Sequence, residues 1–438
     1  MGQTELGGFV GDDGEATRPA DEAEHVAGNG GGAATVVDAE SVRFPDADGA
    51  VTLSVTQVDY TVEGRGDDEF PVVHVFGRRV EDGGASAGIG DDDGDHPPLE
   101  HVEVYDFKPY FYAPVENVDD ERIASYDRLT GYEETDADGE PYESIRGERL
   151  VKIFGQTPRD VGQIRDEFDH YEADILFPNR LLIDKDIESG VRVPERRLDD
   201  GNIRVPHQEV EAVDATVDPR VNTFDIEVDD RNGFPEDGEQ TIVCLTSHDS
   251  YSDEYINWLY QSPAGVDGPA ALEEYDPIEG DIEADVRVFD DEAEMLSAFA
   301  DYIEETNPDV LTGWNFADFD APYLLDRMEE LQSYDHDYDL DIDRLSRVDE
   351  VWRSDWNGPD IKGRIVFDLL RAYKSTQRTE LESYRLDAVG EVELGVGKER
   401  YSGDIGDLWE QDPERLLEYN LRDVELCVEL DRKQDIVA

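Results

Sequence analysis

The segment from 221 to 230, VNTFDIEVDD, constrains the fold of this chain more than any other segment. Its apolar residues alternate with polar ones, which is typical of a partly buried β-strand. Asp225 and Glu227 lie two positions apart, so a strand places both side chains on the same face. Two neighbouring carboxylates repel each other unless a cation lies between them, and oxygen ligands suit Mg²⁺ or Mn²⁺. A strand end with two solvated acids would give the same pattern. The positions of the other acids in the chain are needed to distinguish a cation site from a solvated strand end.

The charge of the chain is extreme. Its 438 residues include 111 acidic and 38 basic side chains, which gives a net charge of −73. Very acidic chains are often disordered, but here the acids occur within segments of clear apolar periodicity. In concentrated salt the screening length falls to about 3 Å, so self-repulsion is weak while surface carboxylates keep the protein hydrated. We therefore expect a folded, salt-adapted protein.

The composition also limits the cellular location that the protein can have and the partners that it can bind. No apolar stretch is long enough to cross a membrane and no signal peptide is recognised, so we expect no membrane partner and a cytoplasmic location. Cys244 and Cys427 both lie in apolar segments and are predicted to be small core residues. The negative charge argues at first against DNA as a partner, because DNA-binding proteins usually carry basic patches. That argument weakens in high salt, where counterion release contributes little.

Residues 1–45 are rich in Gly, Ala, Asp and Glu, which predicts a disordered acidic tail. Within this tail, Gln3, Leu6, Phe9 and Val10 have the spacing Q-x-x-aliphatic-x-x-aromatic-apolar. The spacing resembles the peptide by which replication proteins dock on the sliding clamp, so the clamp is a candidate partner. The alternative is a disordered end without a partner.

Residues 46–217 are predicted to form a strand-rich α+β domain. The segments 51–62 and 71–79 alternate apolar and polar residues, which predicts a hairpin. A further strand is predicted over 101–114, and the segment 175–185 is predicted to be extended.

The segment 186–218, with scattered Pro, Arg and Asp, is predicted to be a linker. Residues 218–438 alternate strands and helices, which is typical of an α/β nuclease core. Within this part, a strand is predicted over 309–313, and helices are predicted over 290–308 and from 413 onward.

Two further carboxylates are predicted to lie near the first pair. Asp320 stands where the strand at 309–313 passes into a helix, at the sheet edge where α/β sites form. Tyr419 and Asp423 are four residues apart on the C-terminal helix, so they share one face. An aspartate on an inward face needs a partner, and a cation beside Asp225 would supply one.

Four carboxylates from three segments, with a tyrosine nearby, are the ligand set of a two-metal phosphoryl-transfer site. One cation would activate a water near the tyrosine, and the other would stabilise the leaving 3′-oxygen. We expect two Mg²⁺ or Mn²⁺ ions per site. The predicted ligands are Asp225, Glu227, Asp320 and Asp423, and the predicted catalytic residues are these four and Tyr419.

Three motifs resemble those of a known family in both order and spacing. They are DIE at 225–227, GWNFADFD at 313–320 and YNLRD at 419–423. These motifs are similar to the three exonuclease motifs of family B DNA polymerases. The resemblance implies a ribonuclease-H-like domain with a proofreading 3′→5′ exonuclease, acting on the single-stranded 3′ end of a DNA primer. We expect Asn315 and Phe319 to contact the primer end.

The resemblance extends upstream, where QVDYTVEG at 57–64 and FKPYFYA at 107–113 are similar to the N-terminal domain of archaeal members. Together with the acidic composition, it indicates a halophilic archaeon. In archaeal members this domain can hold a pocket that captures uracil in the template strand. Tyr60, Pro109 and Leu150 match positions of that pocket, although a role in the apolar core is the simpler explanation of each.

The expected fold is therefore α/β and α+β. It comprises the disordered tail over 1–45, a mixed α+β N-terminal domain over 46–217 and the ribonuclease-H-like exonuclease domain over 218–438. The palm, fingers and thumb of the family are expected to be absent, because the chain ends shortly after the third motif, and we expect no DNA polymerisation from it. Two alternatives stay open: a non-catalytic DNA-binding fragment, and a subunit that needs a separate polymerase half.

Overall fold

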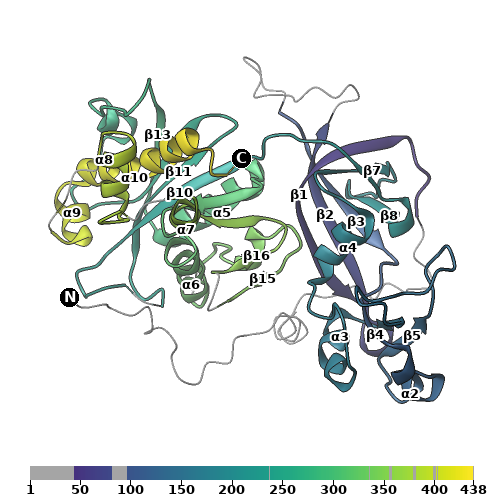
Figure 1. Ribbon diagram of the computed structural model, residues 1–438. Coiled ribbons are helices and arrows are strands. Elements are labelled where there is room, and N and C mark those ends of the chain that lie inside the picture. The colour runs from purple at the N-terminus through teal and green to yellow at the C-terminus, as the bar shows by residue number, and fades with distance from the viewer. Residues whose placement is uncertain are drawn as a thin grey trace, which may run out of the picture.

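The computed structural model describes residues 44–80, 96–235, 237–334, 336–354, 358–377, 381–397, 401 and 403–437. Nearly all of the predicted tail, including the clamp-like residues Gln3, Leu6, Phe9 and Val10, lies outside the described residues. The described chain is built around two six-stranded sheets, called here the first and the second sheet, which lie side by side in Figure 1.

The first sheet combines early strands with three later ones. Its elements are β1 (Ala50–Glu63), β2 (Phe70–Val80), β3 (Leu99–Tyr105), β7 (Gly190–Pro194), β8 (Ile203–Pro206) and β9 (Glu211–Val213), covered by α4 (Phe177–Lys185). The strand order is β8-β3-β2-β1-β7-β9. β1 and β2 are antiparallel neighbours, which confirms the predicted hairpin. Apolar side chains on one face of the sheet pack with Phe177 and Leu181 of α4 into one buried core.

A smaller three-stranded sheet, with the order β4-β6-β5, lies next to the first sheet (Figure 1). Its elements are β4 (Tyr110–Pro114), β5 (Leu129–Glu133) and β6 (Leu150–Gly155), with the helices α2 (Asp120–Ala124) and α3 (Pro158–Ile164). Thr157 and Asp160 form a capping box that begins α3, because each side chain satisfies a backbone N–H of the other.

Three sequence predictions for this half are wrong. The strand predicted over 101–114 is broken, because Asp106 adopts a left-handed backbone conformation (φ 64°) between β3 and β4, which belong to different sheets. The segment 175–185, predicted to be extended, contains the helix α4. Pro178 is compatible with that helix because a proline in the first turn needs no N–H donor. The predicted linker 186–218 supplies β7, β8 and β9 of the first sheet.

The second sheet has the strand order β13-β12-β11-β10-β14-β17. Its strands are β10 (Val221–Val228), β11 (Ile242–Asp249), β12 (Glu254–Tyr260), β13 (Glu283–Phe289), β14 (Val310–Gly313) and β17 (Ile365–Asp368). The helices around it are α5 (Glu292–Thr306), α6 (Asp320–Gln332), α7 (Leu369–Thr376), α8 (Leu386–Glu393), α9 (Ile405–Gln411) and α10 (Pro413–Gln434). A short antiparallel pair, β15 (Val351–Trp352) and β16 (Asp360–Ile361), accompanies them.

The central strand of the second sheet is β10, antiparallel to β11 and parallel to β14. Helices α5 and α6 share one buried apolar cluster with β10, β11 and β12. Helix α10 packs against β10 and β11. Together, the two sheets and their helices confirm the mixed α/β and α+β architecture predicted from the sequence. Within the described residues, none of the helices has the length and hydropathy that a membrane crossing needs.

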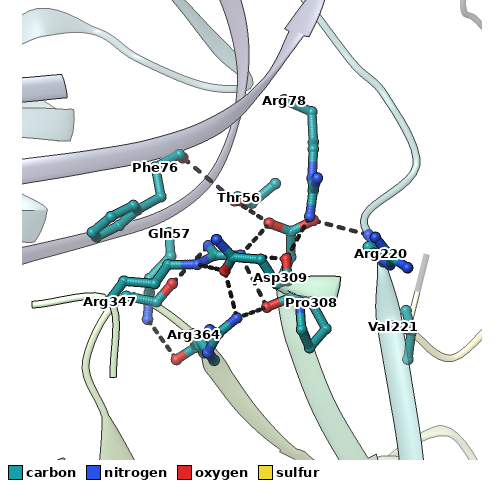
Figure 2. A network of polar contacts seen from close by, with 12 residues as sticks. Thr56, Gln57, Phe76, Arg78, Arg220, Val221, Pro308, Asp309, Arg347 and Arg364 are labelled. Carbon is teal, nitrogen blue, oxygen red and sulfur yellow. Dashed lines mark hydrogen bonds and ion pairs between the residues drawn. The ribbon is translucent and has the colours of Figure 1, made fainter. Parts of the chain in front are cut away.

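A buried polar network joins the two sheets (Figure 2). Asp309, which directly precedes β14, is fully buried and accepts hydrogen bonds from Arg78 Nε of β2 at 2.7 Å and from Arg347 Nη2 at 3.1 Å. It also accepts from Thr56 Oγ1 of β1 at 3.2 Å and from the backbone N–H of Arg220 at 2.9 Å. Because Arg220 directly precedes β10, one carboxylate anchors the starts of β10 and β14 on the first sheet.

A second buried contact joins the first sheet to the segment after β16. Lys362 is 1% exposed, and its Nζ donates to the carbonyl oxygen of Tyr60 at 2.8 Å and to Glu350 Oε2 at 2.7 Å. The backbone N–H of Gly363 donates to Asp59 Oδ2 of β1 at 2.8 Å. Buried charged groups therefore hold the two halves of the molecule together.

Candidate active site

Strand β10 carries the first two carboxylates of the site. Phe224, Ile226 and Val228 are buried in the core beside α5 and α6. Because side chains alternate along a strand, Asp225 and Glu227 lie on the opposite face, where both are half-buried. The predicted strand and its alternation are confirmed.

Asp225 and Glu227 meet Asp423 of α10. Each of the three side chains offers a carboxylate oxygen, and these oxygens lie within 4.8 Å of one another. Asp423 is only 4% exposed. Among the residues that the structure describes, this is the one group of three or more His, Cys, Asp or Glu side chains that comes so close together. Carboxylate oxygens at this spacing fit a hard divalent cation such as Mg²⁺ or Mn²⁺.

Asp320 lies close to this group but is not one of its three members. It is the first residue of α6, is 2% exposed, and accepts a hydrogen bond at Oδ1 from the backbone N–H of Ile226 at 3.2 Å. Burial, and to a smaller extent the acids Asp368 and Asp423, raise the pKa of Asp320 to about 7, against the hydrogen bond from Ile226. A fourth acid therefore lies against the middle of β10, where it adds to the concentration of negative charge.

Helix α10 holds Tyr419 and Asp423 one turn apart, so both lie on the same face of the helix. Tyr419 is half-buried. The next residue, Asn420, is fully buried and donates a hydrogen bond from Nδ2 to Asp225 Oδ2 at 2.7 Å. The sequence analysis did not single out Asn420. A polar side chain beside the motif tyrosine, on an inward-facing part of the helix, was the signal that could have found it.

The turn between β14 and α6 carries Asn315 and Phe319. Asn315 has a left-handed backbone (φ 64°), and its carbonyl oxygen accepts from the backbone N–H groups of Asp318 at 3.2 Å and Phe319 at 3.1 Å. Asp368 Oδ2 accepts from the backbone N–H of Ala317 at 3.1 Å. The tight turn brings Asp320 back toward β10 and leaves Asn315 and Phe319 half-buried beside it.

Phe319 belongs to a row of aromatic rings. Its ring stacks on Tyr323, with the ring centroids 5.7 Å apart, and lies 6.0 Å from the ring of Phe234. Phe234, in the loop after β10, is 76% exposed. Aromatic rings that reach solvent can stack on unpaired bases. Sequence reasoning missed Phe234, although an aromatic residue in a Gly- and Pro-containing loop directly after the DIE strand was a usable signal.

Two of the predicted pocket residues of the N-terminal half, Tyr60 and Leu150, lie in different sheets, and Pro109 directly precedes β4. Tyr60, on β1, is buried, and its ring meets Phe177 edge to face at a centroid distance of 5.5 Å. Leu150 is buried on β6 of the three-stranded sheet. The carbonyl oxygen of Pro109 accepts from the backbone N–H of Gly155 at 3.0 Å.

Comparison with known proteins identifies the fold around this site. Residues 168–389, just over half of the chain, match the family model described as DNA polymerase family B, exonuclease domain. The matched segment contains Asp225, Glu227 and Asp320, and it ends before α10.

Solved and curated proteins agree with this match. The chain is similar in structure to the family B DNA polymerase from the hyperthermophilic archaeon Pyrobaculum calidifontis, with a TM-score of 0.61. The match covers 87% of this chain and 45% of that chain. At 23% sequence identity, the similarity shows the fold. It is 32% identical over 234 residues to the DNA-directed DNA polymerase of Escherichia phage RB69, which covers 50% of this chain and 26% of that protein. It is 28% identical over 349 residues to the DNA polymerase of Pyrococcus glycovorans, which covers 75% of this chain and 38% of that protein. The aligned part is thus well under half the length of either relative.

Proposed function

The chain belongs to the exonuclease-domain family of family B DNA polymerases, and from that premise we propose that it removes nucleotides from the 3′ end of DNA with the help of divalent cations. It is homologous to the proofreading 3′→5′ exonuclease region of these polymerases. The observation that carries the proposal is the convergence of Asp225, Glu227 and Asp423, from a strand and a distant helix, within 4.8 Å. In this proposal residues 218–438 form the exonuclease domain and residues 46–217 the N-terminal domain.

The four acids would hold the cations. Asp225, Glu227 and Asp423 offer oxygens at a spacing that fits one hard cation, and Asp320, buried against β10, would complete the set for a second. When bound, Mg²⁺ or Mn²⁺ supplies positive charge that offsets the charge developing on the phosphate and on the leaving 3′-oxygen.

Tyr419 would orient the attacking water. Its half-buried side chain lies on the same face of α10 as Asp423, and a phenolic hydroxyl can both donate and accept a hydrogen bond. This role needs the hydroxyl but no change in its protonation.

The turn before α6 and the exposed aromatic row would hold the substrate. Asn315 would contact the primer end, and the rings of Phe234 and Phe319 would stack on its unpaired bases. Because the net charge of −73 repels DNA, we expect the activity to need concentrated salt, which screens this repulsion.

The test is a nuclease assay on a 3′-labelled single-stranded oligonucleotide in concentrated KCl. We expect shortening with Mg²⁺ or Mn²⁺, no shortening with a chelator, and none by an Asp225→Ala variant. The matched control is Asp138→Ala, which removes an exposed acid from the turn after β5 and should keep full activity. Metal-independent shortening, or equal shortening by the Asp225→Ala variant, would refute the proposal.

We further propose partners for the N-terminal half. Tyr60, Pro109 and Leu150 would line a pocket for a uracil in the template strand, which predicts that Tyr60→Ala weakens binding of uracil-containing DNA relative to the thymine-containing control.

The tail residues Gln3, Leu6, Phe9 and Val10 would bind a sliding clamp, and Phe9→Ala should abolish that binding. We also propose a separately encoded polymerase half as a partner, a halophilic archaeon as the source and the cytoplasm as the location. Co-purification with a chain that carries palm motifs would support the polymerase partner.

A further inference from the structure

Asn420 ties the helix of the candidate site to its strand. Its side chain is fully buried, and its Nδ2 donates to Asp225 Oδ2 at 2.7 Å and approaches the backbone oxygen of Asp225 at 3.4 Å. One amide group of α10 therefore contacts both the carboxylate and the main chain of β10. We propose that Asn420 is a positioning residue that fixes the Asp225 carboxylate for cation binding, and that Cys244 fixes the orientation of Asn420. This inference rests on the proposed function of the site.

Cys244 of β11 determines which way the amide of Asn420 points. It is fully buried, lies opposite Glu227 in the β10–β11 ladder, and donates from Sγ to Asn420 Oδ1 at 3.5 Å. A cysteine thiol, whose ordinary pKa is about 8.5, keeps its proton at neutral pH, so Cys244 is the hydrogen-bond donor in this contact.

A protonated thiol on one side and a carboxylate on the other allow a single orientation of the amide. The carboxylate of Asp225 accepts hydrogen bonds, so it must face the NH₂ group of Asn420, and the thiol donates, so it must face the amide oxygen. A flipped amide would place its oxygen against a carboxylate oxygen, which is repulsive. The three side chains therefore form a chain of hydrogen bonds, from Cys244 through Asn420 to Asp225, with a fixed direction.

A fixed ligand loses less freedom when a cation binds, so it binds more tightly. Groups that hydrogen-bond to metal ligands contribute about 10- to 100-fold to metal affinity or activity in other proteins. Asn420 also couples the two elements that supply the ligands, because α10 carries Asp423 and β10 carries Asp225 and Glu227. Loss of this coupling should loosen the spacing of all three oxygens.

The chain offers a matched control in Asn257. This residue of β12 is also fully buried between the sheet and α10, where its Nδ2 donates to Thr246 Oγ1 at 2.6 Å and to the carbonyl oxygen of Leu417 at 3.4 Å. Neither partner is a carboxylate of the site. Asn257→Leu and Asn420→Leu therefore remove the same group from the same interface, but only the second change removes a contact to Asp225.

The experiment measures Mn²⁺ binding by titration calorimetry in concentrated KCl, with an Asp225→Asn/Asp423→Asn variant as the baseline for weak binding to surface acids. We expect Asn420→Leu to weaken Mn²⁺ binding roughly 10- to 100-fold. Asn257→Leu should leave the affinity near that of the wild type, although both variants lower the melting temperature. Equal Mn²⁺ affinities of Asn420→Leu and Asn257→Leu would overturn the inference.

The thiol is tested by its own pair of variants. Cys244→Ser keeps a donor toward Asn420 and should bind Mn²⁺ about as tightly as the wild type, whereas Cys244→Val should bind more weakly. Since both residues act through one hydrogen-bond chain, Cys244→Val combined with Asn420→Leu should be no weaker than Asn420→Leu alone. Additive losses of affinity in the double variant would contradict the assigned role of Cys244.

The nuclease assay separates this inference from the proposed function. One outcome is that the wild type binds Mn²⁺ and Asn420→Leu binds it more weakly, but the wild type leaves DNA intact. This outcome would refute the proposed function and support the positioning role. Wild-type protein that shortens DNA, with equal metal requirements in the two leucine variants, would refute the positioning role alone.

Discussion

Two clusters of charged side chains lie along β10, and they are balanced in opposite ways. At the starts of β10 and β14, a single carboxylate, Asp309, is held by the guanidinium groups of Arg78 and Arg347 (Figure 2). Farther along β10, Asp225 and Glu227 converge with Asp423 of α10. The first cluster supplies its own cations, whereas the second gathers acids from two elements.

The pKa shifts of two buried aspartates express the same difference. Burial alone would raise the pKa of Asp309, but Arg347 and Arg78 bring it below its ordinary value. Burial raises the pKa of Asp320 to about 7, and the acids Asp368 and Asp423 act in the same direction. A buried acid with its own arginines is satisfied by the fold. A buried acid whose pKa is raised by neighbouring acids indicates a site where the protein has to bind positive charge from outside.

The largest effect should come from removing a ligand of the acidic cluster, which is the group of Asp225, Glu227 and Asp423. We expect Asp225→Asn to lower the rate of metal-dependent 3′ shortening on the order of 10⁴-fold, or roughly 5 kcal/mol of transition-state stabilisation. The metal-free variant should be at least as stable as the wild type, because one of three adjacent acids is neutralised. The rate is measured with the labelled oligonucleotide, and the stability by urea unfolding in KCl with chelator. A clear loss of stability would mean that Asp225 resembles Asp309 and that the comparison fails.

The reverse result is expected at the interface cluster, which is the network of Asp309, Arg78 and Arg347 between the two sheets. Asp309→Asn leaves the buried guanidinium groups of Arg78 and Arg347 without their carboxylate, which should cost about 4 kcal/mol of unfolding free energy. The cost should persist in concentrated KCl, because buried pairs are poorly screened. Urea unfolding in KCl measures it. The rate of DNA shortening per folded molecule should stay within about twofold of the wild type, and a large fall would show that the anchor also positions the site.

The acidic cluster could be predicted from the sequence because its signals are local. The alternation around Asp225 and Glu227 defines a strand face, the start of α6 follows Asp320, and a spacing of four residues places Tyr419 and Asp423 on one face of a helix. The resemblance to three family motifs then brought these segments together. How close the side chains come to one another, and the buried contact of Asn420 with Asp225, depend on packing that no local pattern contains.

The interface cluster could not be predicted, because its partners are far apart in sequence. Arg78 and Asp309 are separated by 231 positions, and in so acidic a chain a single buried aspartate has no distinguishing pattern. The same limit applies to 175–185, where apolar residues and a proline gave no clear period. It also applies to 186–218, where β7 pairs with β1 and β8 pairs with β3, strands that are distant in sequence. Local propensity is a weak guide where tertiary packing decides.

A third test measures how pH changes the stability of the protein through Asp59, which accepts from the backbone N–H of Gly363 at the second contact between the halves. Burial, with Asp360 and Glu350 nearby, raises the pKa of Asp59 to about 7, although Gly363 N–H and Lys362 oppose this. The folded pKa lies above the unfolded one, so the stability that Asp59 contributes is fully present below pH ~4 and is lost as the pH rises through about 7. At pH 5 the folded wild type keeps Asp59 protonated while the unfolded chain does not, so Asp59→Asn should exceed the wild type by only roughly 1.5 kcal/mol of unfolding free energy.

At pH 8, the Asp59→Asn variant should exceed the wild type by on the order of 4 kcal/mol of unfolding free energy. Burial also raises the pKa of Asp360, so the unfolding free energy of both proteins keeps some further dependence on pH. The quantity to measure is therefore the difference in unfolding free energy between the two proteins at each pH. Urea titrations at the two pH values, at constant KCl, provide it. Parallel curves would show that Asp59 is charged at pH 5 and balanced by Lys362, as Asp309 is by its arginines.

The smallest effect is expected at an exposed ion pair close to the acidic cluster, and it isolates burial as the variable. Arg231, in the loop after β10, pairs with Asp229 at 2.6 Å and with Glu410 of α9 at 2.5 Å, and all three side chains are partly exposed. Arg231→Gln should cost at most about 1 kcal/mol of unfolding free energy at low salt, because exposed pairs gain little and lose side-chain freedom. In concentrated KCl the cost should approach zero as screening removes the attraction, while that of Asp309→Asn stays. If both costs fell equally with salt, the arginines around Asp309 would be acting as a screened surface pair, and burial would not be what distinguishes the Asp309 network from the Arg231 ion pair.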